Sequence, residues 1–348
     1  MKKALIAMSG GVDSSVAAYL MQQAGFACSG ATMQLWDSDQ AGSAADAQKV
    51  AQRLGMEFFI FDYTSDFRRD VVDAFVCCYE QGGTPNPCIQ CNRHLKFGSL
   101  LEKALSLGYE KLATGHYAVV KQDASTGRYL LFKATDRKKD QSYFLSCLTQ
   151  AQLSHIEFPL GALPKEQVRE IAQDQGFLNA RKKDSQDICF IPDGDYLSFM
   201  KQYTGKDYPS GDFLDLTGKV LGKHGGTVGY TIGQRKGLGL AMGQPVYVCA
   251  KDMDKNTVTV GSNDDLFRSV LRANNWNWIA IPELTEPIRA TAKIRYRHTE
   301  QPATVYPEEN GFARVEFDTP QRAITPGQTV VLYDEDKVIG GGTIQKAI

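Results

Sequence analysis

The sequence contains no apolar run of about 18 residues, and a short apolar segment follows the first lysines directly, where a secreted protein would carry a leader. We therefore expect no membrane-spanning helix and no membrane partner, and we predict a cytoplasmic protein. The sequence also lacks an excess of charge, since 39 lysines and arginines face 40 aspartates and glutamates, for a net charge of -1. This balance excludes a surface that is basic all over, so a nucleic-acid contact would have to come from local basic clusters.

Cysteine pairs are scarce as well. Only one Cys-x-x-Cys occurs among the eight cysteines, so a four-cysteine zinc site built from two such pairs is excluded. In a reducing compartment, cysteines serve as core side chains, metal ligands or redox groups rather than as permanent disulfides. At 348 residues the chain exceeds one typical core, and we expect two or three domains.

The first 120 residues alternate apolar strand signals with amphipathic helix signals. This alternation predicts an α/β fold with a doubly wound parallel sheet, which binds ligands at the carboxyl ends of its strands. Residues 118–135 predict a hairpin appended to that sheet, and helical patterns return in 141–153 and 165–176. The expected strands are 4–8, 26–35, 56–62 and 111–117, and the expected helices are 14–24, 44–55, 65–80 and 96–107.

The texture of the sequence changes near residue 205. Glycine is dense and the strand signals are short from 211 to 261, which predicts a small β module, and the later runs 291–296, 313–317 and 329–333 predict strands of a β-barrel. We therefore expect three domains: a catalytic nucleotide-binding domain at 1–204, a small central β-rich domain at 205–265 and a C-terminal β-barrel at 266–348.

The segment from Ser9 to Ser15 joins the first expected strand to the first expected helix. Backbone N–H groups converge at such a switch, two adjacent glycines allow close approach of a polyphosphate, and the serine hydroxyls add donors. Asp13 could cap the helix or hold Mg²⁺. No lysine follows as in a Walker A loop. The alternative is a glycine-serine turn that caps an ordinary helix. The expected nucleotide-binding residues here are Ala7, Met8, Ser9, Gly10, Gly11, Val12, Asp13 and Ser14.

Two segments place cysteines beside cations. Cys88 and Cys91 follow a Pro-Asn-Pro loop that we expect to end where a helix begins at Lys96, and this position favours a Cys91 thiolate. Cys189 follows Lys182 and Lys183. Three interpretations remain open: a turn with a core cysteine, a metal or iron–sulfur site using two or three of the sulfurs of Cys88, Cys91 and Cys189 with or without His94, or thiol chemistry by Cys91 and Cys189.

The chain resembles the tRNA-specific 2-thiouridylases over essentially its full length. The loop from 7 to 15 resembles the SGGxDS loop of ATP pyrophosphatases with a HUP-like fold, which release AMP and pyrophosphate. The order and spacing of the matching stretches carry the resemblance: AMSGGVDSS (7–15), PNPCIQCN (85–92), LATGHYA (112–118), KDQSYFL (139–145), KKDSQDICFI (182–191), GYTIGQRKGLG (229–239), KIRYR (293–297) and TPGQTVVLY (325–333).

The resemblance implies ATP-dependent 2-thiolation of the wobble uridine of tRNA, with Lys, Glu and Gln acceptors. ATP with Mg²⁺ would adenylate the C2 oxygen, and Met33 and Gly115 would contact the adenine nucleotide. Cys91 matches the nucleophile, and Cys189 matches the cysteine that carries a persulfide, delivered by a cysteine desulfurase or a sulfur relay protein. The family usually has aspartate where this chain has Cys88. This departure keeps the nucleophile assignment on Cys91 but gives more weight to the metal or cluster alternative.

The resemblance also implies a set of tRNA contacts. Lys293, Arg295 and Arg297 would put cations on alternate positions of a strand, on one face that could meet phosphates, and the alternative is an ordinary solvated face. Two alternatives to thiolation are another ATP-dependent ligase that adenylates a small molecule and a non-catalytic, nucleotide-gated RNA-binding protein. The expected tRNA contacts are Asn86, Pro87, Cys88, His116, Lys139, Asp140, Gln141, Arg295, Tyr296 and Gln328.

Overall fold

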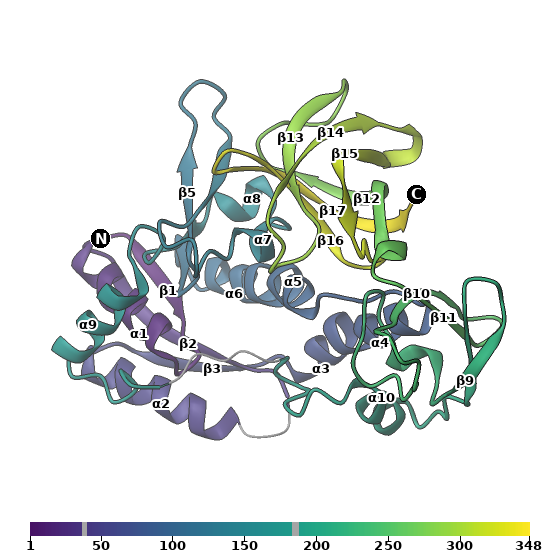
Figure 1. Ribbon diagram of the computed structural model, residues 1–348. Coiled ribbons are helices and arrows are strands. Elements are labelled where there is room, and N and C mark those ends of the chain that lie inside the picture. The colour runs from purple at the N-terminus through teal and green to yellow at the C-terminus, as the bar shows by residue number, and fades with distance from the viewer. Residues whose placement is uncertain (37–39, 183–187) are drawn as a thin grey trace.

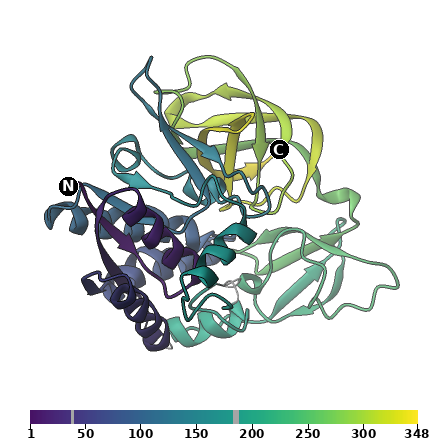
Figure 2. The same cartoon turned by 90° about the vertical axis from the view of Figure 1, so that its left-hand side faces the viewer.

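The computed structural model describes residues 1–36, 40–182 and 188–348. The strands in these residues form three sheets, of five, four and eight strands (Figure 1). None of the helices in these ranges is long and apolar enough to cross a bilayer. Figure 2 shows the C-terminal barrel above the central module, with the N-terminal α/β region beside both.

The N-terminal sheet is entirely parallel and has the strand order β3-β2-β1-β4-β7. This order confirms the predicted doubly wound sheet. The fifth strand, at the edge, was not predicted, because its two residues are too few to give a periodic signal. The strands are β1 (Lys3–Ala7), β2 (Ala27–Gln34), β3 (Phe58–Asp62), β4 (Lys111–Thr114) and β7 (Ile156–Glu157).

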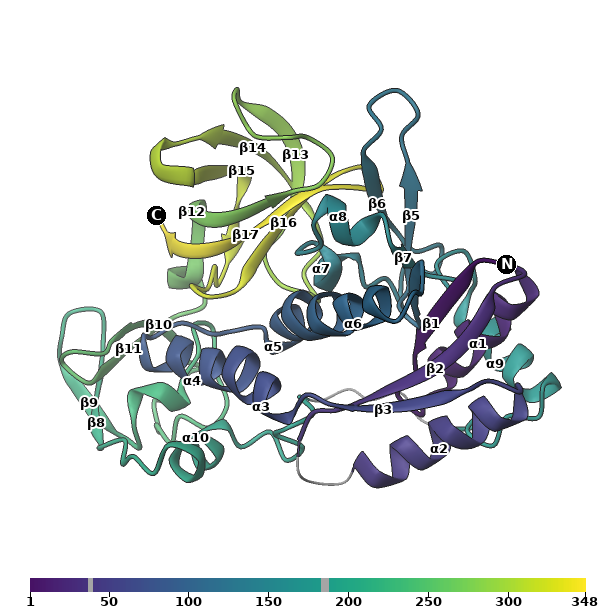
Figure 3. The same cartoon turned by 180° about the vertical axis from the view of Figure 1, so that it is seen from behind.

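Helices cover both faces of this sheet, α2 (Gln40–Arg53) on one side and α6 (Leu100–Ser106) on the other (Figure 3). The alternation of side chains along β1 explains this arrangement. Leu5 packs in the cluster that contains α6, whereas Ile6 packs in the cluster that contains α1 (Val12–Gln23), α2 and α9 (Lys165–Asp174). Both side chains are fully buried, and each contributes about 1.5–3 kcal/mol of transfer free energy.

The helix expected at 65–80 contains one turn of π-helix. It consists of α3 (Thr64–Phe67), η1 (Arg68–Val72) and α4 (Asp73–Glu80). The next helical stretch runs through α5 (Pro87–Gln90), η2 (Cys91–Ser99) and α6, so the prediction that this helix begins at Lys96 is wrong. Pro87 occupies the first helical position, where a missing N–H costs nothing and its fixed φ suits the helix.

The hairpin of β5 (Ala118–Gln122) and β6 (Tyr129–Lys133) exists, but it does not extend the parallel sheet as expected. Both edges of β4 are already paired, with β1 and with β7. Instead, β6 pairs with β17 (Lys337–Ala347) and joins the C-terminal sheet. The helical segment expected at 141–153 is two single turns, α7 (Ser142–Leu145) and α8 (Gln150–Leu153).

The central module is a four-stranded sheet preceded by a helix that the sequence analysis missed, α10 (Tyr196–Thr204). This helix ends at Gly205, which has a left-handed φ of 66°. The sheet order is β10-β11-β8-β9. The strands are β8 (Gly211–Leu214), β9 (Val220–His224), β10 (Tyr247–Asp252) and β11 (Thr257–Gly261), with the short helix η3 (Thr227–Gly229) between β9 and β10.

The predicted C-terminal barrel is confirmed: six antiparallel strands close because β12 pairs with both β15 and β17. The prediction that Lys293, Arg295 and Arg297 share a strand face is wrong. The strand ends at Lys293, and the chain turns there to reach β14. The remaining elements are η4 (Asp264–Leu266), β12 (Phe267–Trp278), β13 (Ile288–Lys293), β14 (Gln301–Pro307), η5 (Glu309–Gly311), β15 (Ala313–Arg322) and β16 (Thr329–Asp334).

Candidate nucleotide and thiol site

The loop after β1 has the geometry of an anion cradle. Gly10 has φ +71°, and a Cβ there would lie 2.2 Å from the carbonyl oxygen of Ser43, so only glycine fits. Gly11 is the N-cap of α1, and no side chain caps the helix. The N–H groups of the first turn have no intrahelical acceptors and carry the positive end of the helix dipole, so they can receive a phosphate.

Hydroxyl groups stabilise this loop from within. Ser14 Oγ accepts from the Ser9 N–H at 3.2 Å and donates to the Gly11 carbonyl, and Ser15 Oγ donates to the same carbonyl at 3.0 Å. Asn179, which is buried, supports the loop from outside: its Nδ2 donates to the Gly10 carbonyl and to Ser15 Oγ. The conformation of the cradle is therefore fixed before any ligand binds.

Asp13 in this loop is already paired. Lys165 Nζ, at the start of α9, lies 2.7 and 2.8 Å from the two carboxylate oxygens, and the Tyr117 hydroxyl donates to Oδ1 at 2.8 Å. Carboxylate oxygens such as those of Asp13 are ligands that Mg²⁺ prefers. However, Lys165 and Tyr117 occupy the sites on Asp13 that a metal ion would use.

The expected nucleotide-binding residues gather at the point where the strand order reverses, between β1 and β4. Met8 follows β1, Met33 lies near the end of β2 and Gly115 follows β4. A Cβ at Gly115 would lie 2.7 Å from the Asp13 carbonyl carbon and the Ser14 nitrogen, so β4 approaches the loop closely. Ligands bind at this position in open α/β sheets.

Cys88 and Cys91 lie on the first turns of the helix that begins at Pro87. Cys88 is exposed, whereas Cys91 is buried in a cluster with Leu35, which lies just beyond β2. Cys91 therefore packs at the same edge of the sheet as the nucleotide loop. Charge on Cys91 or Cys88 raises the pKa of Cys189, so the structure brings the three thiols into one neighbourhood.

Burial controls the protonation of these thiols. Desolvation raises the pKa of Cys88 and Cys91, and Lys96 only partly offsets it. Cys189 is exposed as a residue, yet desolvation at its sulfur, with smaller contributions from Cys91 and Cys88, raises its pKa to about 11. The expected Cys91 thiolate is therefore wrong for this conformation, because burial in the apolar cluster affects the Cys91 pKa more than Lys96, which lies five positions further along the helix.

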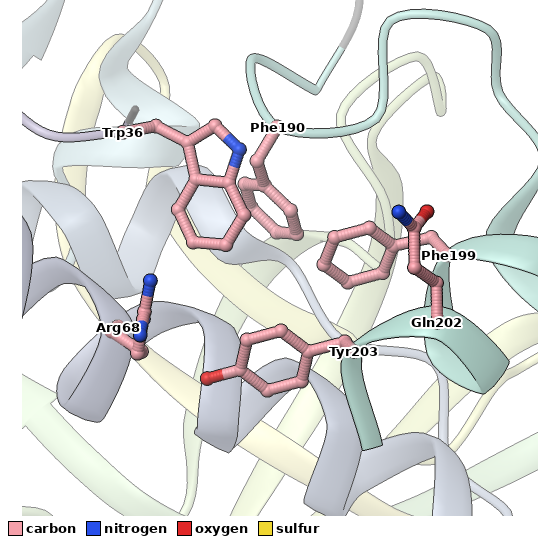
Figure 4. Close-up of a pocket in the computed structure, with 6 residues that line it drawn as sticks. All are labelled: Trp36, Arg68, Phe190, Phe199, Gln202 and Tyr203. Atoms are coloured by element: carbon pink, nitrogen blue, oxygen red, sulfur yellow. The ribbon is translucent and has the colours of Figure 1, made fainter. Parts of the chain in front are cut away.

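Aromatic side chains anchor Cys189. Its neighbour Phe190 packs edge-on against Phe67 and Phe75 and faces Trp36 at 6.2 Å between ring centroids. Of these rings, Phe190 and Trp36 also line a pocket of about 390 Å³. Its lining residues point toward a common space in Figure 4: Trp36, Arg68, Phe190, Phe199, Gln202 and Tyr203.

The cysteines do not form a cluster ligand set. Among the residues that the structure describes, no three histidine, cysteine, aspartate or glutamate side chains are placed to hold a metal ion. Cys88, Cys91 and Cys189 all belong to these described residues. This arrangement does not fit an iron–sulfur cluster, and it favours the two-thiol interpretation over the cluster interpretation. Lys183, named above beside Cys189, lies outside the described residues.

Several residues expected to contact tRNA hold the fold around the site. Asp140 is buried and accepts from the Ala134 and Ser142 N–H groups. Gln141 Oε1 accepts from the Tyr117 N–H, and the Gln141 N–H donates to the Tyr117 carbonyl. Lys139 follows a turn, with its N–H bonded to the Asp136 carbonyl. This segment thereby fixes Tyr117 beside Asp13.

His116 lies between the rings of Phe97 and Phe158, and its Nδ1 is 2.6 Å from Thr114 Oγ1. Desolvation holds its pKa well below the usual value, so the ring is neutral at pH 7. Asn86 is the N-cap of α5, and the following Pro87 is buried. Asn86 and Pro87 therefore lie at the start of the helix that carries Cys88 and Cys91.

The barrel residues of the expected contact set lie near the same site. The Tyr296 ring stacks at 4.3 Å on Phe144, and Arg295 lies in the turn after β13. Gln328 Nε2 donates to the carbonyl oxygens of Thr84 and Pro85 at 2.8 and 3.3 Å. Gln328 therefore connects the barrel to the loop that precedes Cys88.

Comparisons with known proteins agree with this geometry. Family models match residues 2–193 (tRNA methyl transferase HUP domain), 197–262 (tRNA methyl transferase PRC-barrel domain) and 268–344 (aminomethyltransferase beta-barrel domain). The chain is 48% identical to the tRNA-specific 2-thiouridylase of Acetivibrio thermocellus, with 99% of each chain covered. It is 49% identical to that of Moorella thermoacetica, with 98% of this chain and 99% of the relative covered.

The chain belongs to the tRNA-specific 2-thiouridylase family. The resemblance inferred from its motifs is thus confirmed.

The motif analysis of this 2-thiouridylase family member missed three residues that contact the nucleotide loop: Tyr117, Lys165 and Asn179. They are 104, 152 and 169 residues from the loop positions that they contact. No local pattern marks them, and only the folding of β4, α9 and the segment after α9 brings them to the cradle.

Proposed function

We propose that this chain replaces the C2 oxygen of the wobble uridine of tRNA with sulfur, using ATP and releasing AMP and pyrophosphate. A uracil C2 carbonyl has no leaving group, so its oxygen has to be activated first. In the proposed reaction, O2 attacks the α-phosphate and pyrophosphate leaves; AMP later departs with the oxygen. We propose that residues 1–204 carry this chemistry and that 205–265 and 266–348 support tRNA binding.

The loop residues Ala7 to Ser14, with Met33 and Gly115, would hold the nucleotide. The N–H groups of the first turn of α1 would stabilise the charge on the leaving pyrophosphate, where preorganised donors have their greatest effect. Mg²⁺, when bound, would neutralise the phosphate charge, and Asp13 would hold it only once Lys165 has left the carboxylate oxygens.

Cys189 and Cys91 would transfer the sulfur. A persulfide on Cys189 either attacks C2 directly or is attacked by the Cys91 thiolate, which releases sulfide as the nucleophile. In the direct route, Cys91 then attacks Cys189 Sγ, which breaks the bond to the transferred sulfur and leaves that sulfur on C2. Both routes therefore end in a Cys91–Cys189 disulfide, and a thiol reductant restores the two thiols. The donor would be a cysteine desulfurase or a sulfur relay protein of the cytoplasm.

The remaining residues would position the tRNA. Asn86, Pro87 and Cys88 would lie at the target base, because they form the start of the helix that carries Cys91, and Cys88 is exposed there. The other proposed contacts are His116, Lys139, Asp140, Gln141, Arg295, Tyr296 and Gln328. For Asp140 and Gln141, whose side chains are hydrogen-bonded within the protein, the contact would be to the backbone or indirect.

One observation supports this proposal above the others: Cys91 packs in one buried cluster with Phe190, the neighbour of Cys189, and with Leu35 just beyond β2, and charge on Cys91 raises the pKa of Cys189. A ligase that adenylates a small molecule needs no such pair. An RNA-binding protein without catalysis needs neither the pair nor a cradle.

The test combines purified protein, Mg-ATP, a sulfide source and unmodified tRNA, and it measures AMP and the retardation of thiolated tRNA in a mercury-containing gel. We expect both products from the wild type, and loss of thiolation in C91S and C189S. C249S, which removes a half-buried thiol of the central module, should leave both products unchanged.

The alternatives predict different results. Full AMP release by C91S and C189S with a small molecule, without tRNA, would favour the ligase. Nucleotide binding without pyrophosphate release would favour the RNA-binding protein. Iron and acid-labile sulfide in anaerobically purified protein would restore the cluster interpretation.

A further inference from the structure

The phosphate cradle contains no lysine in its own sequence, yet the fold brings one to it. Lys165 Nζ lies 2.7 Å from Asp13 Oδ1 and 2.8 Å from Oδ2, so it bridges both oxygens of the carboxylate. The Lys165 side chain is 8% exposed and the Asp13 side chain 28%. Asp13 belongs to the first turn of α1, whose N–H groups form the cradle.

The surroundings fix this lysine in place. Its own N–H donates to Asp136 Oδ2, its ammonium lies 5.7 Å from the centre of the Tyr117 ring, and the Tyr117 hydroxyl donates to Asp13. A second cation, Lys182, reaches the Gly10 carbonyl and pairs with Asp46. Lys182 is 41% exposed, so Lys165 is the cation that is withdrawn from solvent at the cradle.

The charges of the cradle pose a problem for a polyphosphate. Asp13 already places one negative charge in the loop, and a bound polyphosphate would add several more negative charges. Like charges that lie close together and are partly buried repel one another strongly. Lys165 neutralises Asp13 in the ligand-free protein. A phosphate group bound in the loop would lie close to Asp13 and carry more negative charge than its carboxylate. It would therefore be a stronger ion-pair partner for the Lys165 ammonium.

We propose that Lys165 is a ligand of the nucleotide phosphates, held on Asp13 until the nucleotide enters and then transferred to the phosphate. Tyr117 keeps Asp13 oriented while the lysine is away, and the carboxylate oxygens that Lys165 vacates become available. The inference rests on the proposed function only in that the loop binds ATP; it concerns binding and not sulfur transfer.

Binding of pyrophosphate and of ATP in EDTA, measured by calorimetry, tests the proposal without metal and without catalysis. The variants are K165M, D13N and the double variant D13N/K165M. D13N removes the competitor of the phosphate, so we expect binding about threefold tighter than in the wild type. The double variant should bind about tenfold to a hundredfold more weakly than D13N, as expected for loss of one charge-assisted contact.

The comparison of D13N with the double variant is decisive, because neither protein contains an unpaired buried carboxylate and a folding defect of K165M alone does not affect it. Equal binding by these two proteins would overturn the proposal and leave Lys165 as an internal ion-pair partner. K111M is the matched control, since Lys111 pairs with Glu157 at 2.9 Å at the opposite end of β4 and should not change binding.

The outcomes separate the two proposals. A wild-type protein that binds neither pyrophosphate nor ATP would contradict the proposed function. A wild-type protein that binds both and thiolates tRNA, with D13N and the double variant equal, would contradict the role of Lys165 alone.

Discussion

The thiols of the site are protonated in the ligand-free conformation, because desolvation at the sulfur outweighs the nearby ammonium. Lys96 lowers the pKa of Cys88, Cys91 and Cys189, but in each case burial is the larger effect. A protonated thiol is a poor nucleophile. The ligand-free conformation therefore keeps Cys88, Cys91 and Cys189 in their less reactive, protonated form.

Alkylation of Cys189 should accordingly depend steeply on pH. With a pKa of about 11, the thiolate fraction and thus the rate of reaction with iodoacetamide should rise about tenfold for each pH unit from 7 to 10. A free cysteine derivative, with its pKa near 8.5, should reach a plateau within the same range. Site-resolved mass spectrometry measures the rate at Cys189.

Lys96 supplies the matched variants for this measurement. K96Q removes the charge that lowers the Cys189 pKa and should slow alkylation about threefold at pH 8, whereas K96R keeps the charge and should not. A plateau in the wild type below pH 9 would contradict the raised pKa.

At the scale of single elements, the sequence predicted strongly periodic segments and missed those that depend on neighbours. The strands β1 to β4 and the helix α1 follow from apolar periodicity alone. The start of the cysteine helix was misplaced by nine residues, because the prolines at 85 and 87 indicate a loop until Pro87 is recognised as a first helical residue. The partner of the hairpin β5–β6 was also misplaced, since pairing depends on which strand edge is free.

Arg128 makes this hairpin part of the barrel. Its guanidinium donates to the carbonyl oxygens of Ile279, Ile281 and Trp278 at 3.0, 3.0 and 3.3 Å. We expect R128A to lower the free energy of unfolding by about 2 kcal/mol, because hydrogen bonds from a charged donor are lost and partly buried carbonyls stay unpaired. Urea denaturation measures this change.

R137A serves as its control. Arg137 also pairs across the same contact, with Asp336, but both side chains are about half exposed, so its loss should cost less than about 0.5 kcal/mol. Equal effects of the two substitutions would show that the hairpin is not held by Arg128.

At the scale of the whole molecule, the N-terminal α/β region, the central module and the C-terminal barrel are in contact at Thr84. The Thr84 N–H donates to the Pro326 carbonyl of the barrel, and its Oγ1 lies 3.3 Å from Thr231 Oγ1 of the central module. The sequence could not predict this junction, because the contacts join positions 147 and 242 residues apart. The motifs to which the sequence analysis assigned chemistry are each short and complete in themselves, so they could be recognised without the fold.

Gln328 also belongs to this junction. We expect its side chain to position the segment before the cysteine helix in the protein without tRNA. Because its Nε2 donates to the Thr84 and Pro85 carbonyls, Q328A should loosen the segment that leads into the cysteine helix. Loss of these bonds should speed amide hydrogen exchange at residues 84–90 about fivefold in the protein without tRNA. Q345A, which removes an exposed amide of β17 bonded to Asn274, should leave exchange there unchanged. If exchange at residues 84–90 is the same in Q328A and in the wild type, Gln328 does not position the cysteine helix. If it rises as expected, the barrel sets the geometry of Cys88 and Cys91 from outside their own domain.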